Sequence, residues 1–423
     1  MALTGALFAG VSGINANGNA MNIIGDNIAN VYTIGLKSSR AVFFDLLSAD
    51  VGGTKVGLGS RLADAQRPFV QGGVETTNSP TDMAIQGRGL FVLRDAAGAS
   101  FYSRAGQFVL DDQGNLINPS GLRVQGFGLD SAGNINTGLG DIVINQTVIA
   151  PTPTSIITST VNLDATATTP VPVFPVATGL PAAWFAGANF STVLTVFDSL
   201  GQGHDLTYLF RKTAANTWDY RVVANAAEVG GTAGNLQQVS SGTLGFNANG
   251  SLNAGTTTIN PIGAVAWANG ASAQTITAAN QNFLGTTQYA QASSVSVLNQ
   301  DGSTSGVLRG INIGTDGTIT GQFTSGGTQP LFRVALADFA SPEGLTHLGN
   351  SLFLESQESG PRLIGAPDNG SFGTVLSGSL ELSTVDLATE FVKMVTTQRA
   401  FQASSRTITV TDTLLEEVSN LKR

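Results

Sequence analysis

Apolar side chains recur every seven residues along the first 31 residues of the chain. A repeat of seven places one apolar stripe on a helix and calls for a second helix to cover it. The same segment carries six asparagines between Asn15 and Asn30, together with several glycines, and these residue types disfavour an isolated helix. We therefore expect a helix that is stable only against a partner. Its stripe comprises Leu3, Leu7, Ile14, Met21, Ile24, Ile28 and Val31.

The partner helix is expected at the opposite end of the chain, over residues 385–423. Ser383 and Asp386 form a start that resembles a capping box, and neither Pro nor Gly interrupts the segment after them. Taken alone, each stripe also fits an amphipathic helix packed on the core of its own domain. Sevens at both ends of the chain favour a coiled-coil pair. The second stripe comprises Leu387, Met394, Phe401, Ile408 and Leu415, with Phe391 beside it.

The residues between the two helices have the pattern of short β-strands. Turn sequences such as DDQGN (111–115), DSAGN (130–134) and NANG (247–250) recur between short apolar runs, which predicts small sandwiches or barrels. A Pro- and Thr-rich stretch at 150–175 indicates a crossing between two β domains. The predicted fold class is mainly β with α-helical termini. The predicted domains are a helical domain (1–31 with 385–423), an inner β domain (32–145 with 285–384) and an inserted outer β domain (146–284).

Charge and cysteine content exclude several classes of protein. Only 12% of the 423 residues are charged and the net charge is −9, whereas nucleic-acid binding needs a basic surface. Cysteine is absent, so neither disulfides nor thiolate metal sites can hold the fold. No apolar run approaches the length of a membrane span, and Lys37 is the first basic residue. We expect no nucleic-acid partner, no membrane insertion and, if the protein is exported, an uncleaved N-terminus.

Candidate catalytic chemistry is sparse. The two histidines, His204 and His347, have no cysteine, histidine or cluster of acidic residues at metal-ligand spacing, and we interpret both as turn or surface residues. The glycine pairs in GFGLDSAG and GQGHDL fail the full phosphate-binding patterns and fit hairpin turns. We therefore expect no enzyme activity, no cofactor and no metal site.

The N-terminal segment resembles the signature of the bacterial flagellar rod and hook family of axial proteins. In that signature a Ser-Gly start leads to an Asn-Ile-Ala-Asn core, followed by Thr, Gly, an aromatic residue and Lys. This chain departs from it at Asp26, Tyr32 and Leu36, where Asn, Asn and an aromatic residue are usual. The matching positions are Asn27, Ile28, Ala29, Asn30, Thr33, Gly35 and Lys37.

Two further blocks extend the resemblance to roughly half the chain. Residues 78–127 resemble the family's β module, and the block that begins with PLFRVALADF at residue 330 resembles its C-terminal part. Rod-type members are shorter and lack most of the insert, while residues 195–220 resemble the outer domain of hook-type members. The hook type is therefore favoured. A rod subunit and a secreted β-rich adhesin remain the alternatives.

The resemblance implies a structural subunit that polymerises with copies of itself into a curved helical tube. In the family, the hook acts as a universal joint that transmits motor torque to the filament. The implied partners are the distal rod protein, the hook cap protein, the hook-filament junction proteins and the flagellar export apparatus. The implied location is extracellular, in the flagellar hook and basal body. We further predict that both terminal helices are disordered in the monomer and fold on assembly.

Overall fold

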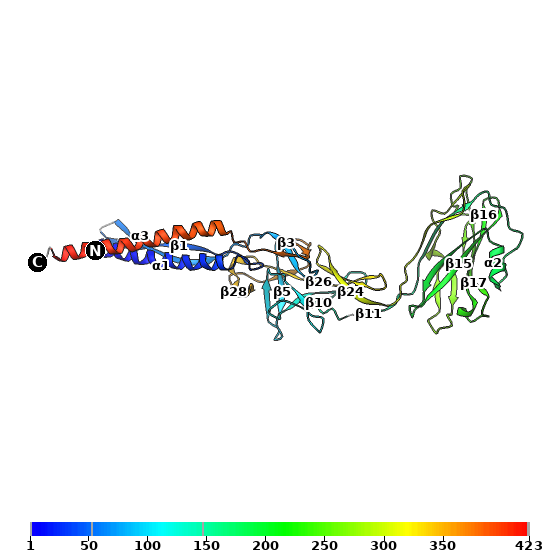
Figure 1. Cartoon of the computed structure of the whole chain (residues 1–423), viewed down its shortest axis with the longest axis horizontal. Helices are drawn as coiled ribbons and strands as arrows, with labels where there is room; N and C mark the ends of the chain where they lie inside the picture. The colour runs from blue at the N-terminus through cyan, green and yellow to red at the C-terminus, as the bar shows by residue number, and fades with distance from the viewer. Residues whose placement is uncertain (1, 52–53, 146–147, 421–423) are drawn as a thin grey trace. The chain divides into compact units, whose positions relative to one another are not determined.

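The computed structural model describes residues 2–51, 54–145 and 148–420; for residues 2–4, 47–51, 54–56, 418 and 419 it describes the backbone alone. The chain divides into two compact units (Figure 1). Unit 1 comprises Met1–Asn145, Gly310–Gly321 and Thr328–Arg423, and unit 2 comprises Gln146–Arg309 and Gln322–Gly327. Unit 1 therefore contains both chain ends, and unit 2 is inserted into it.

Unit 2 extends beyond the predicted outer domain, which ended at residue 284. β22 (Thr287–Tyr289) pairs in parallel with β12 (Ile157–Asp164), and β23 (Ser294–Gln300) pairs antiparallel with the same strand. Because β12 holds both return strands by backbone hydrogen bonds, residues 285–309 belong to unit 2 and not to the inner β domain. The predicted boundary was wrong on this side because a strand pattern does not reveal which strand it pairs with.

Two long helices of unit 1 lie side by side and run antiparallel (Figure 1). α1 spans Ala2–Ala29 and α3 spans Leu387–Asn420. Asp386 caps α3, because its Oδ1 accepts a hydrogen bond from the Thr389 backbone N–H at 3.0 Å. α1 ends two residues earlier than predicted, which leaves Val31 outside the helix. Among the residues that the structure describes, no helix is long and apolar enough to cross a membrane.

A long hairpin packs along α1. β1 (Arg40–Val51) pairs antiparallel with β2 (Thr54–Gln66), and the Ser12 hydroxyl of α1 bonds the Leu58 carbonyl and the Ser60 N–H of β2. Gly59 has a φ of +99°, and a Cβ there would collide with the Ser12 hydroxyl. The sequence interpretation assigned residues 40–66 to the inner β domain. The glycine-based contact with α1 places them beside the helices instead.

The rest of unit 1 is a β core. Strand β5 (Leu90–Arg94) pairs with β6 (Ser100–Ser103), β9 (Arg123–Leu129) and β27 (Leu336–Asp338), so residues from both halves of the chain share one sheet. Its buried cluster includes Leu90, Tyr102 and Phe339. The other elements are β3 (Val74–Thr76), β4 (Met83–Gln86), β7 (Val109–Leu110), β8 (Leu116–Ile117), β10 (Ile135–Asp141), β26 (Thr328–Val334), η3 (Pro342–Gly344), β28 (Thr346–Gly349), β29 (Leu352–Leu354), β30 (Leu363–Gly365), β31 (Thr374–Ser377) and β32 (Ser379–Glu381). β24 (Gly306–Ile313) and β25 (Thr318–Phe323) contain residues of both units.

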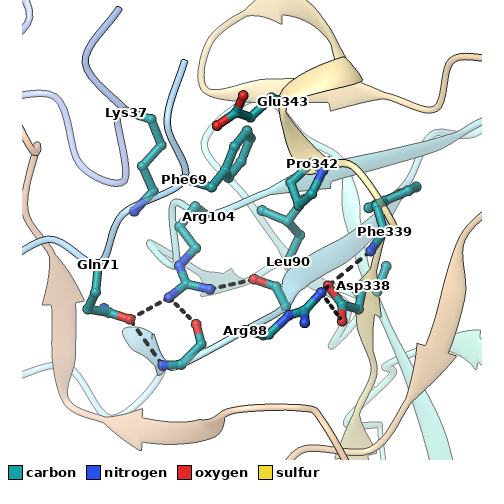
Figure 2. Close-up of a pocket in the computed structure, with 13 residues that line it drawn as sticks. Lys37, Phe69, Gln71, Arg88, Leu90, Arg104, Asp338, Phe339, Pro342 and Glu343 are labelled. Carbon is teal, nitrogen blue, oxygen red and sulfur yellow. Dashed lines mark hydrogen bonds and ion pairs between the residues drawn. The ribbon is translucent and has the colours of Figure 1, made fainter. Parts of the chain in front are cut away.

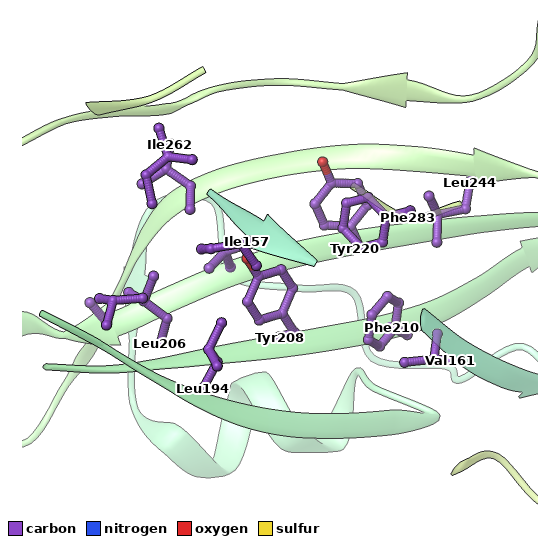
Figure 3. Close-up of a cluster of buried hydrophobic side chains, with 14 of the residues drawn as sticks. Ile157, Val161, Leu194, Leu206, Tyr208, Phe210, Tyr220, Leu244, Ile262 and Phe283 are labelled. Atoms are coloured by element: carbon purple, nitrogen blue, oxygen red, sulfur yellow. The ribbon is translucent and has the colours of Figure 1, made fainter. Parts of the chain in front are cut away.

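Three sheets of unit 2 share one core: the small sheet around β12, a six-stranded sheet, and the two-stranded sheet of β19 and β20 (Figure 3). Alternate residues of β12 are buried, and Ile157 and Val161 pack against the side chains of a six-stranded antiparallel sheet. That sheet has the order β13-β17-β16-β15-β14, with β18 beside β17. The elements are β11 (Val148–Ile149), β13 (Thr178–Gly179), α2 (Pro181–Ala186), β14 (Phe190–Phe197), β15 (Gly203–Ala214), β16 (Thr217–Asn225), η1 (Ala226–Val229), β17 (Leu236–Gly245), β18 (Thr258–Ile259), β19 (Ile262–Val265), β20 (Gln274–Ile276), η2 (Ala278–Asn280) and β21 (Gln281–Asn282). The predicted fold class, mainly β with helical termini, is confirmed.

Candidate assembly surface

The predicted stripe of α3 meets α1 at Ile408, which lies beside Gly10. The five residues of this stripe, spaced seven apart, are all partly buried: Leu387, Met394, Phe401, Ile408 and Leu415. A second set of sevens follows three residues later and is polar, with Glu390 and Thr411 buried and Thr397 and Ser404 partly buried. The sequence interpretation missed this polar stripe, although its spacing of seven was a usable signal. The seam between the helices is therefore half apolar and half polar.

The α1 side of the seam is made of apolar and small residues. Ile24 is buried, and Leu7, Ile14, Met21 and Ile28 are partly buried, as is Val31 beyond the helix end. Ala16 and Ala20 are buried with them. A Cβ on Gly10 would lie 2.8 Å from Ile408 Cγ1, so glycine permits the close approach of the two helices. The side chain of Leu3 lies outside the described residues.

Phe391 does not belong to the seam within one chain. Its side chain is 52% exposed, because it follows the inward-facing Glu390 by one residue and so points about 100° further round the helix. Val392 and Val395 are exposed on the same part of α3. The prediction for Phe391 was therefore wrong as regards the pairing of α1 with α3 in a single chain.

Asn27 of the predicted motif joins three elements. Its side chain accepts a hydrogen bond from the Ser39 backbone N–H at 2.8 Å and donates to the Ser39 carbonyl at 2.7 Å. It also donates to the buried carboxylate of Glu390 at 3.2 Å, and Lys393 donates to the other oxygen of that carboxylate at 2.7 Å. Asn27 is 2% exposed. This residue therefore fixes the end of α1 against both the start of α3 and the chain that enters β1.

The motif residues after Asn27 form the turn that leaves α1. Asn30 donates to the Asp26 carbonyl at 2.9 Å and accepts from the Thr33 hydroxyl at 3.0 Å. Gly35 has a φ of +68° and donates to the Glu381 carbonyl at 2.8 Å; a Cβ there would overlap the backbone of Ala105. Ile28 is partly buried and Ala29 exposed, so their side chains contribute less to the turn.

Lys37 ends the motif in a buried cluster of charges. Its Nζ lies 2.6 Å from Glu381 Oε1 and 2.6 Å from the Val70 carbonyl oxygen. Glu381 is fully buried, and its other oxygen accepts from the buried Arg104. Burial lowers the pKa of Lys37 below its usual 10.5, opposed by the attraction of Glu381 and assisted by the repulsion of Arg104. The cluster ties the turn after α1 to β32 and to the end of β6.

A cleft of about 470 Å³ adjoins this cluster (Figure 2). Its walls include Phe69 and Leu90, and its charged lining residues are already engaged. Arg88 pairs with Asp338 at 3.2 Å, and Arg104 donates to the Gly87 and Ile85 carbonyls at 2.8 Å. The side chains of Arg88, Asp338 and Arg104 are therefore already paired within the chain. This arrangement fits a role in holding neighbouring strands together better than a role in binding a charged substrate.

His204 is buried, contrary to the interpretation of it as a turn or surface residue. Its Nε2 lies 3.0 Å from Asp198 Oδ2, its Nδ1 lies 2.6 Å from Glu228 Oε2, and its ring stacks on Trp267 at 3.7 Å. Burial would raise the pKa of Asp198, but hydrogen bonds from Asn269, His204 and the Gln202 backbone lower it to about 2. Asp198 lies only six residues before His204, but Glu228, Trp267 and Asn269 come from segments distant in sequence, so local spacing could not have revealed the whole network.

His347 is partly buried in β28 of unit 1. Its ring packs edge-on against Phe353, with the ring centres 5.4 Å apart. Burial and the nearby Arg67 lower the pKa of His347. Within the residues that the structure describes, no group of three or more His, Cys, Asp or Glu side chains could hold a metal ion.

Three models of flagellar protein families match the chain. Residues 84–166 match the flagellar hook protein FlgE/F/G D1 domain, and residues 145–303 match the flagellar basal body protein FlaE D2 domain. Residues 376–421 match the C-terminal part of the flagellar basal body rod FlgEFG proteins. The D2 match covers most of unit 2, and the C-terminal match covers α3 and the strands before it.

The decisive similarity extends over almost the whole chain. The flagellar hook protein FlgE of Salmonella typhimurium is 35% identical over 415 residues, covering 97% of this chain and 98% of that protein. The chain belongs to the FlgE family of flagellar hook proteins. Hook proteins of Escherichia coli K12 (35% over 416 residues) and Treponema pallidum (34% over 469 residues) are similar over 97% and 99% of this chain and 98% and 99% of their own length.

A solved hook protein has the same fold. The crystal structure of Helicobacter pylori flagellar hook protein FlgE2 superposes with a TM-score of 0.50 at 15% identity, covering 73% of this chain and 100% of that one. As a hook protein, this chain is a structural subunit of the bacterial flagellar hook. Neither the rod subunit nor the adhesin is favoured, because the full-length relatives are hook proteins.

Proposed function

We propose that copies of this chain polymerise into a curved helical tube, with the paired helices α1 and α3 as the assembly device. The tube would act as a universal joint that transmits torque from the motor to the filament. The observation that carries the proposal is the set of large apolar side chains left exposed on the two helices. This set comprises Phe8 and Val11 on α1, and Phe391, Val392, Val395, Val410 and Leu414 on α3.

The pairing of α1 with α3 within one chain leaves these apolar side chains uncovered. Side chains of this size gain roughly 1.5–3 kcal/mol each when they are fully buried, so neighbouring copies would supply stabilisation that one chain lacks. The seam itself carries a buried carboxylate, Glu390, and a polar stripe, which weaken the pairing of the two helices alone. We therefore infer that the helices are disordered in the monomer and fold on assembly.

The assembly surface is tested by a paired substitution on α3. Phe391→Ser with Val395→Ser removes two exposed apolar side chains without touching the seam, so the monomer should retain its β core while tube formation is lost. Electron microscopy of the concentrated protein provides the measurement. The matched control is Gln402→Ser with Ala403→Ser, an exposed pair on the same helix. Normal tubes from the variant with Phe391→Ser and Val395→Ser would contradict the proposal.

The N-terminus is proposed to remain on the mature subunit. Residues from Leu7 onward contribute to the seam with α3, so cleavage of an N-terminal leader within α1 would remove part of the assembly device. Export would then proceed through the flagellar export apparatus to an extracellular position in the hook. The proposed contacts beyond the tube are the distal rod protein, the hook cap protein and the hook-filament junction proteins.

Unit 2 is proposed to tune the curvature of the tube without being needed to form it. Its core is independent of the helices, because the buried cluster of unit 2 is drawn from residues 157–283. Deletion of unit 2 at the structural boundaries, Gln146 and Arg309, should leave straight tubes. Complete loss of polymer on this deletion would refute the assignment.

A further inference from the structure

An uncharged and strongly exposed segment distinguishes one surface of unit 2. No charged residue occurs between Asp164 and Asp198. Val171 and Val176 are each 95% exposed. Further exposed apolar side chains in the segment are Val173, Leu180 and Phe185. Soluble monomers rarely expose such a concentration of apolar side chains, and where they do it commonly marks an interaction site.

The segment is held in place by its other residues. Phe174 and Trp184 are buried, with ring centres 5.8 Å apart, and Arg221 lies over the Phe174 ring at 5.9 Å. The backbone carbonyl of Pro170 accepts from Arg211 at 3.1 Å, and that of Ala177 accepts from the Gln238 N–H at 2.8 Å. The exposed valines are therefore presented by a fixed backbone.

Proline reinforces this order. Pro170, Pro172 and Pro175 alternate with the exposed valines, and each fixes its own φ near −65°. Such a segment loses little conformational freedom when a partner covers it, so its burial contributes to affinity with a small entropic penalty.

We propose that residues 170–185, here named the valine loop, bind unit 2 of a second copy of this chain. The proposal rests on the proposed function, in which copies assemble. Each copy carries a net charge of −9, so copies approach most readily through contact residues that are themselves uncharged, as all of residues 170–185 are. The receiving surface is β23, an edge strand without charge or proline that exposes Val295 and Val297. Because the two patches differ, the contact is heterologous and propagates from copy to copy.

The test exploits the absence of cysteine. A variant with Val176→Cys carries one thiol, which is labelled with an environment-sensitive fluorophore and measured in monomer and in tubes. The emission should shift to shorter wavelength in tubes. Ala233→Cys, on an exposed loop of the same unit outside the valine loop, is the matched control and should not shift. If the emission of the label at position 176 does not shift in well-formed tubes, the proposed contact of the valine loop is wrong, while the proposed polymerisation still stands.

A second variant identifies the receiving strand. Val176→Cys combined with Val297→Cys should form disulfides between copies in oxidised tubes, giving ladders on a denaturing gel, while monomers below the assembly concentration give none. A shift at position 176 without ladders would mean that another surface or another protein covers the loop, which also overturns the proposal. If the unsubstituted chain forms no tubes at all, the proposed function fails and the valine loop fails with it.

Discussion

At the residue scale, Asn27 is the most connected position of the helix pair. Replacing it with alanine leaves the Ser39 N–H, the Ser39 carbonyl and one Glu390 oxygen without their partner. Because unpaired buried polar groups are costly, we expect Asn27→Ala to destabilise the assembled tube, in which α1 and α3 are paired, by roughly 2–4 kcal/mol per copy. Dissociation of tubes in urea measures this loss. Asn22→Ala, at an exposed position of α1, should cost under about 0.5 kcal/mol, and equal losses would contradict the role of Asn27.

Glu381 is the only carboxylate recorded in ion pairs with Lys37 and Arg104 among the described residues. Glu381→Gln keeps the shape of the side chain but leaves two buried cations without a counter-charge. The expected loss is about 3–5 kcal/mol, typical of breaking a buried pair on one side. Glu75→Gln, an exposed carboxylate on β3, is the control. A loss no larger than that of the control in urea unfolding would show that the cluster does not hold the turn.

Asp198 gives unit 2 an acid-sensitive contribution to stability. Its folded pKa of about 2 lies below the ordinary 3.8, so the unfolded chain binds more protons between these values. The contribution, about 2 kcal/mol, is complete above pH 3.8 and lost as the pH falls to 2. Asp198→Asn should remove it at pH 5 and flatten this part of the pH profile.

Tryptophan fluorescence isolates the effect, because all three tryptophans, Trp184, Trp218 and Trp267, lie in unit 2. The matched control is Asp219→Asn, which removes a partly exposed ion pair with Arg221 and should cost under about 1 kcal/mol. An unchanged pH profile in the Asp198 variant would contradict the assignment.

At the element scale, two glycines of α1 separate helix propensity from helix packing. Gly18 has nothing within 4 Å of an added Cβ, so Gly18→Ala should stabilise the helix by up to about 1 kcal/mol. At Gly10 the same Cβ lies 2.8 Å from Ile408 Cγ1 and 3.3 Å from the Ser404 carbonyl oxygen. Gly10→Ala should therefore lower the temperature at which tubes dissociate, while Gly18→Ala raises it. Turbidity on heating measures both, and a rise in both would contradict the close seam.

The elements differ in how much of them the sequence could predict. The apolar residues spaced seven apart in α3 predicted a helix, and the structure has one over Leu387–Asn420, because a seven-residue repeat is a local pattern. Phe391 was misplaced because an apolar residue next to a stripe looks the same whether α1 or another copy covers it. The hairpin of β1 and β2 was assigned to the wrong neighbours, since its contact with α1 depends on Gly59 and Ser12, which are distant in sequence.

The candidate assembly surface was likewise only partly predictable from the sequence. The motif around Asn27 was recognisable, but the roles of its residues were not, because Ser39, Glu381 and Glu390 come from other parts of the chain. The network around His204 likewise joins residues 198–269 across four segments. Long-range polar contacts of this kind leave no periodic signal in the sequence.

At the scale of the whole molecule, insertion of unit 2 into unit 1 separates two tasks. Unit 1 brings together both chain ends, the helices and the buried charge cluster, while unit 2 holds its own core and the valine loop. The sequence indicated the insertion through its family resemblance and turn pattern. It misplaced the return boundary, because the pairing of β23 with β12 is a tertiary property.

The central claim is that the exposed apolar side chains of α1 and α3 are covered by neighbouring copies. The most direct measurement is a helical reconstruction by electron cryomicroscopy of tubes grown from the full-length chain, at a resolution that shows side chains. The account predicts that Phe391, Val392 and Val395 are buried against the helices of other copies. Tubes in which these three side chains face solvent, with copies joined only through their β units, would contradict it.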